Sequence, residues 1–159
     1  MNYQIRPMRQ TEYPLLDDFL YEAIFIPEGV EPPPRDILQD EALQIYVRNF
    51  GSHPGDACLC AEADGRIVGA VWVRYMHDYG YLDDETPSLA ISLYPEWRGQ
   101  GIGTALMEHM LQMLSDRGIR RVSLSVQKEN YAVRMYRRTG FVTVRETDEE
   151  YLMLWQKGC

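Results

Sequence analysis

The strongest constraint on the fold of this chain is a glycine-rich turn between a strand-like run and an amphipathic helix. The segment from Leu93 to Thr104 reads LYPEWRGQGIGT, with three glycines within five residues at the start of the helix. Glycine lets backbone N–H groups approach a ligand without a Cβ atom in the way. A helix N-terminus adds unpaired N–H donors and partial positive charge, which suit a phosphate or diphosphate. The competing interpretation is a tight turn that needs glycine only for its geometry.

Arg98 favours the anion-binding interpretation, because its planar guanidinium can bind an anion through two donors. The spacing does not fit two common phosphate-binding loops. The dinucleotide-binding fingerprint would need a glycine three residues after Gly103, where this chain has Leu106, and no Gly-Lys-Ser/Thr follows as in a Walker loop. The pattern therefore predicts an anionic ligand of a different class.

Hydrophobic periodicity predicts a strand, two helices, three strands, a helix, a strand, a helix and two strands, in that order. The predicted strands are 3–8, 57–63, 66–75, 89–93, 121–126, 141–144 and 151–155, and the predicted helices are 12–25, 36–50, 101–117 and 130–139. Asp64-Gly65 is a strong hairpin signal between two of the strands. The order predicts a mixed sheet flanked by helices, in one α/β domain spanning residues 1–159.

The charge balance argues against nucleic-acid and membrane partners. Sixteen Lys and Arg against 24 Asp and Glu give a net charge of −8, which repels phosphates and anionic lipids. No run approaches the roughly 18 apolar residues of a membrane span. The first nine residues lack the apolar core of a signal peptide, so we expect a cytoplasmic location.

The cysteines predict neither a disulfide framework nor a zinc site. Cys58 and Cys60 lie two apart in a strand-like run, so both should point to one face as small buried hydrophobes. Cys159 makes the count odd, and the three histidines have no metal-ligand spacing with these thiols. We therefore predict no bound metal.

Two motifs together resemble the GCN5-related N-acetyltransferase (GNAT) superfamily. Arg98-Gly99-Gln100-Gly101-Ile102-Gly103 is similar to its acetyl-coenzyme A (acetyl-CoA) loop, Gln/Arg-x-x-Gly-x-Gly/Ala, which directly follows a strand that contacts the pantetheine arm. Asn130, Ala132, Tyr136 and Gly140-Phe141 resemble a later family helix in which Asn, Ala, Tyr and Gly-Phe recur. The strong part of the resemblance covers residues 89–141.

The resemblance implies an α/β (α+β) fold with a mixed, mostly antiparallel sheet of about seven strands flanked by about four helices. It also implies that one strand bonds to the pantetheine amides as an added strand would, and that the glycine loop cradles the diphosphate. The implied cofactor-binding residues are Ile91, Ser92, Leu93, Arg98, Gly99, Gln100, Gly101, Ile102, Gly103, Thr104, Asn130 and Tyr136.

The reaction implied is direct attack of a neutral amine on the acetyl carbonyl. The N–H of Leu93 would polarise the carbonyl oxygen, and Tyr136 would protonate the departing thiolate as general acid. The competing interpretations are structural: Asn130 is also a good helix N-cap, and Tyr136 would suit an apolar core.

One departure from the family concerns the general base. Many members carry a Glu on the strand before the glycine loop, whereas residues 88–92 here read SLAIS, without a carboxylate. The candidates elsewhere are Asp83, Asp84, Glu85, Glu22 and Glu28. A solvated acidic loop is the simpler interpretation of the first three.

The acceptor is expected between residues 21–34 and 75–85, and the family implies a small-molecule amine, a peptide N-terminus or a lysine. The aromatic and acidic residues of 75–81 could hold a cationic amine, or could be ordinary cross-strand pairs. A non-catalytic acyl-CoA-binding sensor or interaction module is the alternative function. Family members often form dimers, so a homodimer is also expected.

Overall fold

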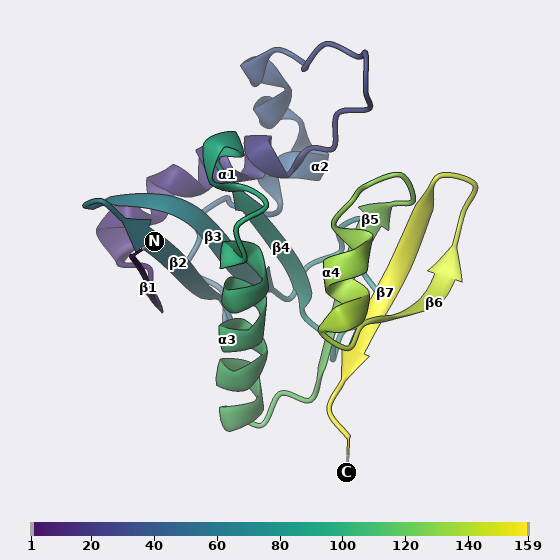
Figure 1. Ribbon diagram of the computed structural model, residues 1–159. Coiled ribbons are helices and arrows are strands. Elements are labelled where there is room, and N and C mark those ends of the chain that lie inside the picture. The colour runs from purple at the N-terminus through teal and green to yellow at the C-terminus, as the bar shows by residue number, and fades with distance from the viewer. Residues whose placement is uncertain (1, 159) are drawn as a thin grey trace.

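The computed structural model describes residues 2–158 and contains one seven-stranded sheet (Figure 1). The strands are β1 (Tyr3–Pro7), β2 (Ala57–Ala63), β3 (Arg66–Arg74), β4 (Ser88–Leu93), β5 (Arg121–Gln127), β6 (Val142–Glu146) and β7 (Glu150–Gln156). Their order in the sheet is β1-β2-β3-β4-β5-β7-β6, and every neighbouring pair is antiparallel except β4 and β5. The predicted mixed, mostly antiparallel sheet is confirmed.

Helices cover both faces of the sheet. They are α1 (Leu16–Ala23), α2 (Glu41–Gln44), α3 (Ile102–Asp116) and α4 (Val133–Arg138). On one face α1 and the α2 region pack around Trp72, and on the other face α3 packs on β2, β3 and β4. The side chains of β2 alternate between these two cores. None of the helices within residues 2–158 is long and apolar enough to cross a bilayer.

The predicted placement of Cys58 and Cys60 on one face of their strand, as small buried hydrophobes, is confirmed. Cys58 and Cys60 are both buried in the core beneath α1, while Leu59 and Ala61 face α3. Cys159 lies outside the described residues.

The parallel pair β4–β5 is joined at one end only. Ser88 is opposite Ser123, whose N–H donates to the carbonyl of Pro87 over 3.0 Å. The Ser123 hydroxyl also donates to the carbonyl of Gly80 over 2.6 Å. Beyond this point the two strands diverge, so β1–β4 and β5–β7–β6 form two leaves of the sheet (Figure 1).

The predicted second helix, 36–50, is wrong over most of its length. A 3-10 turn at Arg35–Gln39 ends at Asp40, which is extended, and α2 has only four residues before a series of turns. Side chains of β3 bind the carbonyls that a longer helix would use. The Trp72 indole N–H donates to Tyr46, and the Arg74 guanidinium donates to Ile45 and Arg48.

Two other predicted helices are shorter than expected. The first begins as a 3-10 turn, Gln10–Leu15, with Pro14 inside it, and becomes α-helical only at Leu16. The helix predicted from residue 130 starts at Val133, because Asn130 lies in the preceding turn and accepts the N–H of Ala132. The hairpin at Asp64-Gly65 is confirmed.

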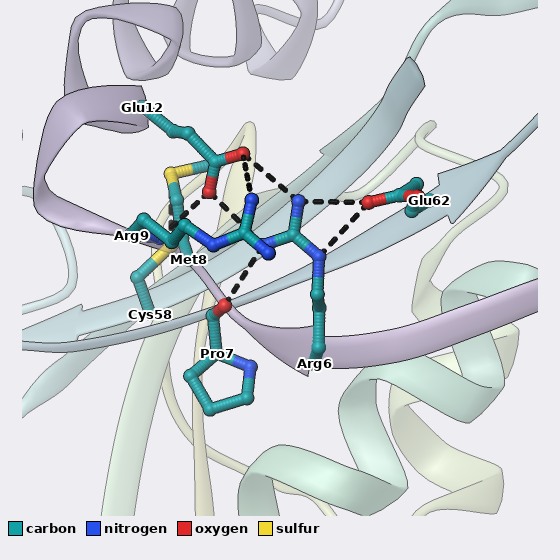
Figure 2. A network of polar contacts seen from close by, with 7 residues as sticks. All are labelled: Arg6, Pro7, Met8, Arg9, Glu12, Cys58 and Glu62. Atoms are coloured by element: carbon teal, nitrogen blue, oxygen red, sulfur yellow. Dashed lines mark hydrogen bonds and ion pairs between the residues drawn. The ribbon is translucent and has the colours of Figure 1, made fainter. Parts of the chain in front are cut away.

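The start of the chain is attached to the sheet by ionic contacts around Arg6 (Figure 2). Its guanidinium donates to both carboxylate oxygens of Glu12 over 2.9 Å and to Glu62 over 3.0 Å. Glu12 also accepts the backbone N–H of Arg9 over 2.7 Å. The hydrogen bond from Arg6 is the main cause that lowers the pKa of Glu12 to about 2.

These contacts predict an acid-dependent contribution to folding stability. A carboxylate whose pKa is lowered in the folded state stabilises it above the unfolded-state value of 4.5, and that contribution is lost as the pH falls towards 2. We expect Glu12→Gln to lower the free energy of unfolding at neutral pH by about 1–3 kcal/mol. Urea titrations from pH 7 to pH 2 should show the two proteins converging below pH 4.5, whereas a constant difference would contradict the prediction.

Candidate active site

A cavity of about 720 Å³ lies where β4 diverges from β5. Its walls come from the C-terminal half of β4, the glycine loop, α4 with the turn before it, and the segment that follows α1. From that last segment Ile24, Phe25 and Ile26 contribute an apolar wall. The cavity therefore brings together segments that are more than 100 residues apart in the chain.

Most of the predicted cofactor-binding residues line this cavity. They are Ile91, Ser92, Leu93, Arg98, Gly99, Gly101, Gly103, Thr104, Asn130 and Tyr136. Gln100 and Ile102 do not line it. The Gln100 amide donates to the carbonyl of Glu96, and the Ile102 side chain is fully buried in the core beneath α3.

The glycine loop opens the N-terminus of α3 to the cavity. Gly101 is the residue before α3 and has a φ of 88°, a left-handed conformation that favours glycine. No atom lies within 4 Å of the position that a Cβ of Gly99 or Gly101 would occupy. In the first turn of α3, Ala105 is the first residue whose backbone N–H forms a helical hydrogen bond, which it donates to the carbonyl of Gly101. The preceding N–H groups at the start of the 15-residue helix are therefore available to an anion.

The Arg98 guanidinium bridges three segments around the cavity. Its Nε donates to the carbonyl of Leu93 over 3.1 Å. Its Nη2 donates to the backbone carbonyl of Glu22 over 3.1 Å and to the Glu22 carboxylate over 3.2 Å. Arg98 thus fixes the end of α1 against the glycine loop while half of its side chain stays exposed.

The backbone of β4 presents alternate residues to the opening. The Tyr94 N–H donates to Val68 in the direction of β3. In an antiparallel pair this direction alternates, so Ser92 bonds towards β3 while Ile91 and Leu93 face β5. Because β4 and β5 pair only at Ser88, the N–H groups of Ile91 and Leu93 point into the gap between the leaves.

Tyr136 lies on α4 at the inner end of the cavity. Its side chain is 8% exposed, and its ring packs 6.1 Å from that of Phe141. Burial raises the pKa of Tyr136 to about 12, because it disfavours the charged phenolate. A phenol in this environment keeps its proton at neutral pH and can donate it to a developing anion.

Sequence reasoning missed three lining residues on the α4 side. Tyr131, Met135 and Arg138 recur at intervals of four and three, so they occupy one face of α4 and the turn before it. The guanidinium of Arg134 lies 5.1 Å from the Tyr131 ring centroid. Counted from Tyr136, the helical period reaches residues 132, 133, 139 and 140 instead, so the predicted motif gave no signal for this face.

Asp83 and Asp84, two of the candidates for the general base, bind other side chains in the structure. Asp83 accepts hydrogen bonds from Thr86 and Arg121, and Asp84 from Tyr81 and His77. These bonds, chiefly those from Thr86 and Tyr81, lower the pKa of the two carboxyls. Both are weaker bases as a result.

The remaining candidates for the general base do not place a free carboxylate in the cavity either. Glu22 lines it but is paired with Arg98, while Glu28 is exposed in the loop after α1 and Glu85 in the loop before β4. Among residues 2–158, no three His, Cys, Asp or Glu side chains cluster as metal ligands.

A different carboxylate lies at the joined end of β4 and β5. Asp78 accepts the hydroxyl of Ser88 over 2.6 Å, next to the Ser88–Ser123 pair. No sequence signal identifies this contact, because Asp78 and Ser88 are ten residues apart across an irregular loop.

Comparison with known proteins gives one consistent result. Residues 16–141 match the family described as "Acetyltransferase (GNAT) family". A mycothiol acetyltransferase from Thermobifida fusca is 30% identical over 129 residues, covering 65% of this chain and 40% of that protein. An aminoglycoside N(6')-acetyltransferase type 1 from Stenotrophomonas maltophilia is 28% identical over 94 residues, covering 57% of this chain and 61% of that protein.

The fold has close counterparts among solved structures. A PaiA N-acetyltransferase from Thermoplasma acidophilum, in complex with coenzyme A, superposes with a TM-score of 0.70 at 20% sequence identity. The match covers 98% of this chain and 99% of that chain. At this identity the similarity is one of fold.

Proposed function

Because the chain belongs to the GNAT family of acetyltransferases, we propose that it transfers an acetyl group from acetyl-CoA to a primary amine. The observation that carries the proposal is the cavity between the leaves of the sheet. There an open helix N-terminus, two unpaired β4 N–H groups and a buried phenol face one space. These groups suit a diphosphate, an amide-containing arm and a thiolate, respectively.

The residues divide the binding of acetyl-CoA between them. The N–H groups at the start of α3 hold the diphosphate, and the lack of side chains at Gly99 and Gly101 lets it approach. The Leu93 N–H bonds to the pantetheine arm as it runs away from the glycine loop along β4 towards Ile91. The Asn130 side-chain oxygen caps the turn before α4, so its amide N–H₂ is the part that reaches the arm.

The reaction follows from the two groups at the inner end of the cavity. The family resemblance implied the Leu93 N–H as the group that polarises the thioester carbonyl. Because Ile91 lies deeper in the gap between β4 and β5, we assign this role to the Ile91 N–H instead. The neutral amine forms the new C–N bond, and the C–S bond breaks. Tyr136 gives its proton to the leaving thiolate, and the proton that the substrate nitrogen loses passes through solvent to restore the Tyr136 phenol.

Calorimetric titration with acetyl-CoA, with coenzyme A for comparison, tests the proposal first. Micromolar binding should then be followed by release of free thiol when a panel of primary amines is added, including an aminoglycoside and a lysine peptide. Absence of binding would overturn the proposal. Binding without thiol release from any amine would favour the acyl-CoA sensor instead.

Tyr136→Phe tests the general acid. We expect turnover to fall by about tenfold to a hundredfold, because the thiolate must then leave without a proton donor, while acetyl-CoA affinity changes little. Tyr13→Phe is the control, because it removes the hydroxyl of a partly buried tyrosine whose ring packs on Phe50, away from the cavity. Equal turnover of the wild type and Tyr136→Phe at every pH would remove Tyr136 from the mechanism.

A further inference from the structure

A second cavity, of about 610 Å³, opens beside the joined end of β4 and β5. It lies on the α1 and α2 side of the sheet. Its walls are α2 and the turns that follow it, Arg74 at the end of β3, and residues 77–79 of the loop before β4. None of these residues lines the cofactor cavity.

Most charges around this second cavity are neutralised by a close partner. Arg48 pairs with Glu41 through two bonds of 2.7 and 2.8 Å, and Arg74 pairs with Asp56 through two bonds of 2.9 and 3.0 Å. His77 contacts Asp84 over 2.9 Å. His53, also in the wall, has its backbone N–H bonded to Asp56.

Asp78 is the exception. It accepts a hydrogen bond from Ser88 and faces the buried hydroxyl of Tyr46, and both groups are neutral. Within residues 2–158, no Lys, Arg or His forms an ion pair with it, so its negative charge stays available to a cation. Beside it Tyr79 is 59% exposed, and the His77 ring stacks on Tyr81 at 4.0 Å. A carboxylate next to an exposed aromatic face favours an ammonium group.

The strand β4 links this carboxylate to the cofactor cavity. Asp78 is bonded to Ser88 at the start of the strand, and Ile91 lines the cofactor cavity three residues later. Three residues of a strand span about 10 Å. A cation held at Asp78 is therefore about 10 Å from an acetyl group held at Ile91, too far to be the amine that attacks it.

We propose that this second cavity binds the distal ammonium of an elongated amine that carries at least two cationic nitrogens, with Asp78 as its counter-ion. Resting on the function proposed above, this identifies the acceptor class as diamines and polyamines. One nitrogen is anchored at Asp78 while the other, about 10 Å away, reaches the thioester. The net charge of −8 also attracts such a substrate.

A matched pair of ligands tests the proposal without altering the protein. Heptamethylenediamine and n-heptylamine have the same carbon chain, and only the diamine has a second ammonium group. We expect calorimetry on the full chain, with and without coenzyme A, to give at least about tenfold tighter binding of the diamine, as for one charge-assisted contact. Equal affinities would overturn the proposal.

Asp78→Asn locates the second ammonium. This change removes the charge and keeps an oxygen that can accept the Ser88 hydroxyl. We expect the variant to bind the two amines with similar affinity, because neither amine then finds a counter-ion at position 78. Asp116→Asn is the control, because the Asp116 carboxylate also accepts a neutral amide, that of Gln112, at the far end of α3. A variant with an unchanged preference for the diamine would place the contact elsewhere and overturn the assignment of Asp78.

The same titrations separate this proposal from the function on which it rests. Failure of acetyl-CoA to bind would overturn the transferase function, whereas the diamine preference is measured without turnover. A protein that binds acetyl-CoA but does not distinguish the two amines would keep the function and lose this acceptor class.

Discussion

Gly101→Glu is expected to weaken acetyl-CoA binding by about a hundredfold or more. The new carboxylate would stand before the N–H groups of α3, where the diphosphate is proposed to bind, and would both repel it and take its donors. Losing two hydrogen bonds to a charged group costs about 3 kcal/mol or more, which corresponds to this factor. Calorimetric titration with acetyl-CoA measures the affinity of the variant, and retained micromolar binding would contradict the assignment of the glycine loop as the diphosphate site.

The opposite end of the same helix supplies the control. Gly118 follows α3 with a φ of 80°, close to the 88° of Gly101, and no atom lies within 4 Å of its missing Cβ either. Gly118→Glu therefore imposes a similar backbone strain and the same charge, outside the cavity. We expect it to lower the unfolding temperature much as Gly101→Glu does while acetyl-CoA affinity is retained. Equal loss of binding in both variants would attribute the effect to strain.

Among the ion pairs formed within residues 2–158, loss of the Asp56 carboxylate by Asp56→Ala should cost the most folding stability. Both side chains of the Asp56–Arg74 pair are 1% exposed. Removing the carboxylate leaves the Arg74 guanidinium buried without its counter-ion, which typically costs about 3–5 kcal/mol. It also removes the acceptor of the Gly51 and His53 N–H groups. Urea denaturation followed by circular dichroism measures the difference.

Glu41→Ala is the matched control for that experiment. Glu41 also binds an arginine through two bonds, but this pair with Arg48 lies on the surface, where water replaces the lost contact. We expect only a small change in the free energy of unfolding. If the two variants lost the same stability, the buried position of the Asp56–Arg74 pair would not explain its contribution.

The parts of the molecule that the sequence predicted well are specified locally. The hairpin depends on Asp64-Gly65 between two strand-like runs, and the start of α3 on the glycines from Gly99 to Gly103. In each case neighbouring residues determine the backbone conformation. The motifs around Tyr136 and the glycine loop also place ten of the twelve predicted cofactor residues around one cavity.

The parts that the sequence did not predict depend on contacts between distant residues. Residues 36–50 have a helical hydrophobic pattern, but Trp72 and Arg74 of β3 bind their carbonyls and end the helix early. Asp78 gains its position from Ser88 and Tyr46, which no local pattern links to it. The cytoplasmic location and the homodimer remain predictions.

The single junction between β4 and β5 has a consequence for motion. Hydrogen bonds across a sheet normally make its strands open and close as one cooperative unit. Here the ladder between the two leaves is limited to Ser88 and Ser123. We therefore expect motion of one leaf against the other to break few hydrogen bonds and to be opposed chiefly by the apolar core that the leaves share. Acetyl-CoA, bound as proposed between Ile91 and the leaf that contains β5, would restrict this motion. Acetyl-CoA bound as proposed between the leaves is therefore expected to lower the flexibility of the whole domain.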